Sequence, residues 1–136
     1  DHALGVAPAP LMDVSQLQQW IEGGQEIGSH TQHHVDLTQT DSNTSQSEIH
    51  NSRVSLSQLL NTNIQQFCYP YGHYTQEHVD MVQASQYLAA TTTERGRVHS
   101  QDNVFELRRI PIVRSTSLPQ FLLKILTSYE DKYRNA

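Results

Sequence analysis

The stretch that decides the fold is residues 26–37, which read Glu26-Ile27-Gly28-Ser29-His30-Thr31-Gln32-His33-His34-Val35-Asp36-Leu37. Gly28 and Ser29 are typical of a strand end, where functional residues concentrate in α/β folds. His30 and His34 follow at i and i+4. Zn²⁺ takes neutral imidazoles at about 2.0–2.1 Å and usually a carboxylate as well. The spacing indicates a metal-binding pair, although two histidines so spaced in a polar chain also occur on a solvated helix face.

A second motif, Phe67-Cys68-Tyr69-Pro70-Tyr71-Gly72, follows an apolar stretch further along the chain. Proline fixes φ and glycine permits a positive φ, so this loop can hold one backbone N–H in a defined direction. An ordinary Pro-Gly turn with two packed aromatic side chains is the alternative interpretation.

Both motifs resemble those of the polysaccharide deacetylases, carbohydrate esterase family 4. Ser29-His30-Thr31-x-x-His34 is similar to the family's Ser-His-Thr-x-x-His segment, and residues 67–72 are similar to its Arg-x-Pro-Tyr-Gly loop in a variant form. Two weaker similarities follow, at Tyr87–Thr93 and Leu107–Ile112. All four stand in the family's order, and the resemblance runs from about Leu11 to Leu126.

The resemblance implies a distorted (β/α) barrel and a metal-dependent deacetylase that acts on a polysaccharide. The expected substrate group is N-acetyl, with O-acetyl as the alternative. It implies that His30 and His34 bind a divalent metal, with Zn²⁺ expected first. It also implies that the backbone N–H of Tyr71 stabilises the oxyanion of a tetrahedral intermediate. The partner would be an acetylated polysaccharide, and the location extracellular, periplasmic or at the cell envelope.

The family's first motif, an Asp-Asp pair that supplies the general base and the third metal ligand, has no counterpart in this sequence. The nearest acidic pair, Glu130-Asp131, is expected to be a solvated charge pair in a polar C-terminal helix. The order of the other motifs places the Asp pair upstream of Asp1. We therefore expect residues 1–136 to form the C-terminal portion of a single deacetylase domain, inactive alone. Its unpaired edges should promote self-association or pairing with the missing segment.

Two further positions depart from the family pattern. Cys68 stands where many members carry the Arg that orients the catalytic Asp, and Arg109 stands where the Leu-x-His motif has the general acid. An Arg is always protonated and cannot serve as that acid. Arg109 therefore either pairs with the missing Asp or is a surface residue at a barrel rim.

His73 is a candidate for the general acid or an exposed loop residue. We expect His33 to lie outside the ligand set and Asp36 to fix the loop.

The composition narrows the function classes. A net charge of −5 over 136 residues argues against a nucleic-acid surface, which needs clustered Lys and Arg. No apolar run approaches the length of a membrane span. Cys68 is the only cysteine, so the chain has no intrachain disulfide and no cysteine-based zinc site.

An inert fragment or a degenerate sugar-binding relative stays the alternative to an enzyme. A module that uses many of the histidines is disfavoured by their scattered spacing.

The periodicity predicts strands alternating with helices, which favours parallel pairing. Four strands are expected, at Gln25–Ser29, Ile64–Tyr69, Tyr87–Thr93 and Phe105–Val113. Helices are expected from Val14 to Ile21, from a capping box at Ser45-x-x-Glu48, from Thr75 through Val82, and from a cap at Ser117-x-x-Gln120. Four parallel strands cannot close a barrel. The predicted fold class is therefore α/β, a partial, distorted (β/α) barrel of about four strands.

Overall fold

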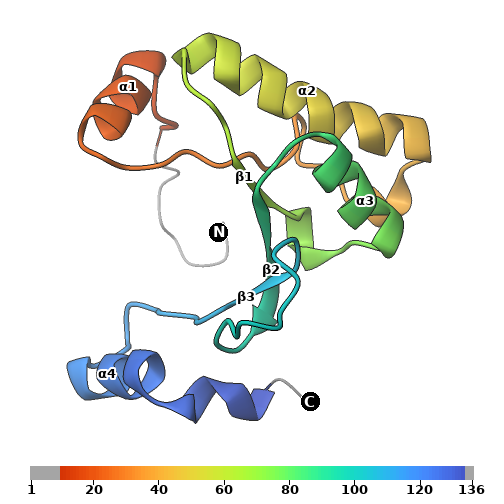
Figure 1. Ribbon diagram of the computed structural model, residues 1–136. Helices are drawn as coiled ribbons and strands as arrows, with labels where there is room; N and C mark the ends of the chain where they lie inside the picture. Colours follow the sequence, from red (N-terminus) through yellow and green to blue (C-terminus); the bar gives the residue numbers. More distant parts are fainter. Residues whose placement is uncertain (1–9, 134–136) are drawn as a thin grey trace.

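The computed structural model describes residues 10–133 and is a mixed α/β fold (Figure 1). The strands are β1 (Gln66–Cys68), β2 (Ala89–Arg95) and β3 (Leu107–Arg109). The α-helices are α1 (Val14–Glu22), α2 (Ser42–Leu60), α3 (Gln76–Ala84) and α4 (Leu118–Leu126). Three short 3-10 helices are η2 (Leu37–Gln39), η3 (Pro70–Gly72) and η4 (Ser128–Tyr133).

The three strands form one parallel sheet in the order β1-β2-β3. Helix α3 connects β1 to its parallel neighbour β2, whereas β2 reaches its own parallel neighbour β3 through a loop. Strand β3 is shorter than expected, because Pro111 has no N–H to donate to a ladder. The sheet is not a closed barrel, which confirms the partial (β/α) architecture.

The expected strand at Gln25–Ser29 is wrong. Only Ser29 pairs with β1, in an isolated parallel bridge to Phe67. Ser29 is buried, whereas Gln25 and Glu26 are exposed. Because the first half of the segment buries no side chain of its own, nothing holds it against β1. The described part of the chain therefore has three strands, one fewer than the sequence predicted.

Helix α2 begins at Ser42, earlier than the capping box expected at Ser45. Asp41 is the N-cap, and its side chain accepts a hydrogen bond from Thr44 N at 3.0 Å. The expected start is wrong because Asp is as good an N-cap as Ser, so the pattern alone does not choose between them. Ser45 and Glu48 are buried and have other partners.

The starts of α3 and α4 are confirmed. Thr75 is the N-cap of α3, and its N–H donates to His78 Nδ1 at 2.9 Å. Ser117 is the N-cap of α4 and forms the expected capping box with Gln120. These two caps fix where the chain turns after η3 and after β3.

One hydrophobic core draws its side chains from β1, β2, α2, α3 and the segments that join them. Its buried members are Leu37, Ile49, Leu60, Ile64, Phe67, Tyr69, Val79, Val82, Tyr87 and Ala90. Figure 1 shows α2 and α3 on one side of the sheet and α4 apart from them. The core thus fixes β1 and the loops that leave it.

Helix α4 contributes no buried residue, although it is the most apolar helix of the structure. Its exposed apolar side chains are Leu118, Phe121, Leu122, Leu123, Ile125 and Leu126. We call them the α4 apolar surface. Within residues 10–133, no helix is both long enough and apolar enough to cross a membrane.

A buried carboxylate holds the C-terminal segment to β2. Glu130 is fully buried, and its carboxylate lies 2.9 Å from Arg95 Nη2 and 2.7 Å from Lys124 Nζ. The side chain of Asp131 accepts from Arg97 N at 3.1 Å. The expected solvated charge pair is therefore wrong for Glu130, because cations from β2 and α4 both reach it.

Candidate metal centre

Ser29 anchors the start of the histidine loop, defined as residues 30–36. Its N–H donates to Gln66 O at 2.8 Å, and its carbonyl accepts from Cys68 N at 2.9 Å. Its buried hydroxyl lies 2.6 Å from Ser52 Oγ on α2. The next residue, His30, is therefore held beside the C-terminal end of β1, the end of a parallel strand where binding residues gather.

His30 is oriented by the backbone of β1. Its Nδ1 lies 2.7 Å from the carbonyl oxygen of Cys68. Because a carbonyl oxygen only accepts, Nδ1 carries the proton, and the neutral ring keeps a lone pair on Nε2. Metal-binding histidines are fixed in this way, by donating one ring N–H to a carbonyl or carboxylate. His30 has the tautomer that a metal ligand needs.

His34 lies beside His30, with ring centroids 4.8 Å apart and planes at 68°. The histidine loop turns back through two residues with positive φ, Thr31 at 62° and His34 at 56°. Such backbone is uncommon for residues other than glycine and clusters at functional sites. The two imidazoles are close together, as a shared metal ion requires. Metal binding by the pair stays a prediction.

Glu48 on α2 pins the middle of the histidine loop. Its Oε2 accepts from the backbone N–H groups of Gln32 and His33 at 2.8 and 2.9 Å, and its Oε1 lies 2.6 Å from His33 Nδ1. Burial alone would raise the pKa of Glu48, but these hydrogen bonds outweigh it and lower the pKa. The His33 side chain is 71% exposed and engaged with Glu48, away from a ligand role. The sequence pattern had placed Glu48 in a capping box.

Asp36 fixes the end of the histidine loop, as predicted. Its Oδ1 accepts from Thr38 N and Oγ1 at 3.0 and 2.7 Å, which caps η2. Its Oδ2 lies 2.8 Å from His73 Nδ1. Hydrogen bonds from His73 and then Thr38 lower the pKa of Asp36. The His73 side chain is 58% exposed, which agrees with the interpretation as an exposed loop histidine.

The Tyr71 loop, η3, faces the histidine pair. Tyr71 has φ 59°, and its ring contacts the His34 ring at a centroid distance of 4.8 Å. Gly72 has φ 73°, and a Cβ at this position would lie 1.9 Å from Thr93 Oγ1. Only glycine fits here. The turn is closed by hydrogen bonds from Gly72 N–H to Tyr69 O at 3.0 Å and from His73 N–H to Pro70 O at 3.1 Å. Neither uses the N–H of Tyr71, whose donation to a ligand stays a prediction.

Arg109 lies at the edge of the same site. Its Nη1 is 3.9 Å from the sulfur of Cys68, whose carbonyl orients His30. The guanidinium is exposed, so it can pair with a carboxylate brought to this edge. The structure thus places all four predicted site residues, His30, His34, Tyr71 and Arg109, around the C-terminal end of β1.

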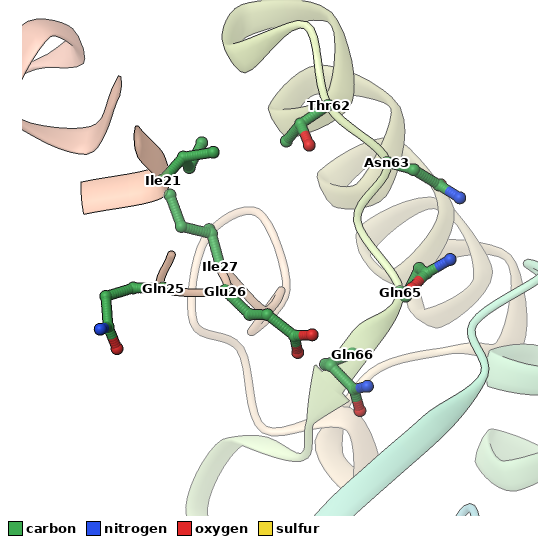
Figure 2. Close-up of a pocket in the computed structure, with 8 residues that line it drawn as sticks. All are labelled: Ile21, Gln25, Glu26, Ile27, Thr62, Asn63, Gln65 and Gln66. Carbon is green, nitrogen blue, oxygen red and sulfur yellow. The ribbon is translucent and has the colours of Figure 1, made fainter. Parts of the chain in front are cut away.

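A separate cavity of about 310 Å³ lies at the opposite end of β1 (Figure 2). Ile21 and Ile27 line one side of it, and Thr62, Asn63 and Gln66 line the other. Its lining contains no histidine. It is therefore no part of the candidate metal centre.

His30 and His34 are two nitrogen ligands, and a catalytic zinc site takes three protein ligands. Among residues 10–133, no group of three or more His, Cys, Asp or Glu side chains could hold a metal ion. The free Nε2 of His30 and the nearby His34 ring fit a metal as part of a set. The third ligand is not found in the described part of the chain.

A family model described as polysaccharide deacetylase matches residues 9–90. The chain belongs to the polysaccharide deacetylase family. The matched region contains both the histidine loop and the Tyr71 loop. A search of curated proteins found no match.

Solved structures from the same class of proteins share the fold of this chain. The Streptococcus pyogenes deacetylase PplD in complex with acetate has a TM-score of 0.82 at 24% identity, covering 90% of this chain and 54% of that chain. BC0361, a polysaccharide deacetylase from Bacillus cereus, has a TM-score of 0.78 at 23% identity, covering 88% of this chain and 38% of that chain. A mutant of BA3943, a CE4 family pseudoenzyme with restored enzymatic activity, has a TM-score of 0.53 at 17% identity, covering 57% and 28%. The chain spans about half the length of the first of these proteins and less of the others.

Proposed function

We propose that this chain is part of a metal-dependent hydrolase that removes acetyl groups from a polysaccharide, with N-acetyl as the favoured substrate group. The observation that carries the proposal is the close pair of imidazoles, with His30 Nε2 left free because Nδ1 donates to the Cys68 carbonyl. Membership of the polysaccharide deacetylase family supports the reaction class. A polysaccharide substrate would place the protein outside the cell, in the periplasm or at the cell envelope.

His30 and His34 would supply two ligands to a divalent metal, with Zn²⁺ favoured by the imidazole donors. Such a metal polarises an acetyl carbonyl and makes a bound water more acidic. We propose that the third ligand and the general base come from an Asp pair outside residues 1–136. The isolated chain should then have no deacetylase activity of its own.

Tyr71 and Arg109 have supporting roles in this proposal. The N–H of Tyr71 donates to the oxyanion that develops on the acetyl carbonyl, a role for which a preorganised backbone donor is suited. Arg109 binds the carboxylate that Cys68 cannot bind, and so orients the general base. Arg109 cannot supply a proton to the leaving amine.

The second candidate is a sugar-binding relative without chemistry. It is favoured by Arg109, which stands where the family's Leu-x-His motif has the His that acts as general acid. In this case the histidine loop and the Tyr71 loop would bind an acetylated sugar and release no acetate.

Acetate release from an N-acetylglucosamine oligomer tests the proposal, using a form of the protein extended upstream of Asp1 to include an Asp pair. We expect release that a chelator abolishes and that His34→Ala removes. Arg109→Ala should lower kcat more than it raises KM. An extended protein that folds, binds metal and releases no acetate from N- or O-acetylated glycans would favour the sugar-binding candidate.

A further inference from the structure

Helix α2 carries three buried polar side chains on a side where a core-facing helix normally has apolar ones. They are Ser45, Glu48 and Ser52, and we call them the α2 polar stripe. Their spacing of three and four residues places them on one face of the helix. Burying a polar side chain is unfavourable unless it is hydrogen-bonded. The partners of the stripe therefore indicate what this face of α2 does.

The two serines of the stripe hold the ends of the histidine loop. Ser52 Oγ lies 2.6 Å from the hydroxyl of Ser29, the residue directly before the loop. Ser45 Oγ lies 3.4 Å from the carbonyl oxygen of Leu37, the residue directly after the loop, and 2.7 Å from Thr40 Oγ1. Because α2 is one continuous helix of 19 residues, it keeps these two anchor points at a fixed separation.

Glu48 holds the bend between the two ends. The chain reverses through positive φ at Thr31 and at His34, which is unfavourable for residues with a Cβ. Such backbone persists only where its surroundings hold it in place. The two N–H groups that donate to Glu48, those of Gln32 and His33, lie directly between the two residues with positive φ. Without these hydrogen bonds, we expect Thr31 and His34 to relax to negative φ.

This bend brings the two imidazoles together. His30 is fixed by its hydrogen bond to the Cys68 carbonyl, and His34 reaches it only because the chain turns back. The His34 ring also makes an edge contact with the Tyr71 ring. A contact between two partly exposed rings is weaker than hydrogen bonds to a buried carboxylate. The separation of the two imidazoles therefore depends mainly on Glu48.

We propose that Glu48, supported by Ser45 and Ser52, is a positioning residue for the candidate metal centre. It sets the separation of His30 and His34 through the backbone of the histidine loop and is not itself a metal ligand. The proposal rests on the function proposed above, since it assigns both imidazoles to one metal ion. The α2 polar stripe is thus the support on which the two imidazoles are arranged before a metal binds.

Zn²⁺ titration of the 136-residue chain, followed by NMR of the imidazole nitrogens, measures the effect on the metal. Glu48→Ala should weaken binding about 10-fold, the lower end of the loss seen when a group that orients metal ligands is removed. Glu48→Gln keeps one accepting oxygen and should recover part of this loss. His33→Ala should bind as the unaltered chain does, because both backbone N–H groups still donate to Glu48.

Two serine variants of α2 form a matched pair, since each removes one hydroxyl from the same helix. Ser52 is buried and holds Ser29, whereas Ser55 is exposed. Ser52→Ala should weaken Zn²⁺ binding, by less than Glu48→Ala does, because Ser29 keeps its backbone hydrogen bonds to β1. Ser55→Ala should leave the affinity unchanged.

A second readout needs no metal. The rings of His30 and His34 are 4.8 Å apart between centroids, close enough for nuclear Overhauser effects between their ring protons. We expect this signal in the unaltered metal-free chain and expect it to be lost in Glu48→Ala while the core signals remain. Val82→Ala removes a buried side chain from α3 and controls for a general loss of stability. It should keep the signal between the two rings.

A folded Glu48→Ala chain that keeps both the ring signal and the Zn²⁺ affinity would overturn the inference. An equal loss of affinity in Val82→Ala would also overturn it. If Glu48→Ala does not fold, Glu48→Gln and Ser52→Ala decide, and an unchanged ring signal and affinity in both would refute the positioning role. Loss of the ring signal in Glu48→Ala, without Zn²⁺ binding by the unaltered chain, would refute the metal centre alone.

Discussion

Replacing Gly72 with alanine tests the geometry that aims the Tyr71 N–H. Gly72 has φ 73°, and an added Cβ would lie 1.9 Å from Thr93 Oγ1 and 2.8 Å from Thr93 Cβ. The hydroxyl can rotate away, but the Thr93 Cβ is fixed to β2. The Tyr71 loop itself must therefore move, and with it the N–H that is proposed to bind the oxyanion.

Three effects set the magnitude. A non-glycine residue at positive φ costs about 1–2 kcal/mol. Overpacking against a fixed neighbour costs about 1–3 kcal/mol. The reduced freedom of the unfolded chain offsets about 0.4–1 kcal/mol of this. We expect Gly72→Ala to lower the free energy of unfolding by roughly 3 kcal/mol.

Gly24 provides the matched control. It has φ 82°, but an added Cβ would meet no atom within 4 Å. Gly24→Ala should therefore cost only the backbone effect, about 1 kcal/mol or less. Urea unfolding followed by circular dichroism measures both variants. Adding Thr93→Ala to Gly72→Ala should recover part of the loss, because alanine removes the Thr93 hydroxyl. The recovery should be incomplete, because the Cβ at position 93 remains in contact. Equal losses at Gly72 and Gly24 would refute the reasoning.

Three further predictions concern the rest of the fold. Burial alone would raise the pKa of Glu130, but hydrogen bonds from Lys124 and Arg95 lower it. The stability that Glu130 contributes is therefore present above about pH 4.5 and lost as pH falls through the lowered pKa. The drop in urea midpoint from the unaltered chain to Glu130→Gln should therefore be smaller at acid pH than at neutral pH. Glu48→Ala should cost about 2–3 kcal/mol in urea unfolding, since three hydrogen bonds to a buried charge are lost; an unchanged midpoint would contradict this. The chain should self-associate through the α4 apolar surface, and sedimentation velocity should show that Leu122→Ser shifts it toward monomer.

The sequence predicted where the candidate site residues lie in the fold, because its motifs follow parallel strands. His30 comes after the bridge at Ser29, and Tyr71 comes after β1, so both lie at the same edge of the sheet. Arg109 ends β3 and reaches Cys68 across the sheet. In a parallel sheet the carboxyl ends of the strands meet at one edge. The order of the motifs was therefore enough to bring these residues together.

The sequence could not predict contacts that depend on the folded chain. Ser45-x-x-Glu48 fits a capping box, yet Glu48 binds the histidine loop, which lies far from it in sequence. Glu130 stands in a polar stretch, and only the docking of η4 on β2 brings it to Arg95. The segment at Gln25 has a strand-like pattern, but it finds no partner along most of its length. In each case tertiary contacts outweighed the local pattern.

Zn²⁺ titration of the chain, followed by NMR of the imidazole nitrogens, tests the central claim most directly. We predict weak binding that shifts Nε2 of His30 and a ring nitrogen of His34 together, and that is lost in His30→Ala and in His34→Ala. His33→Ala is the control from the same loop and should retain binding, because the His33 ring is engaged with Glu48. Binding that persists in both ligand variants, or that shifts His33 and leaves His30 and His34 unmoved, would contradict the account.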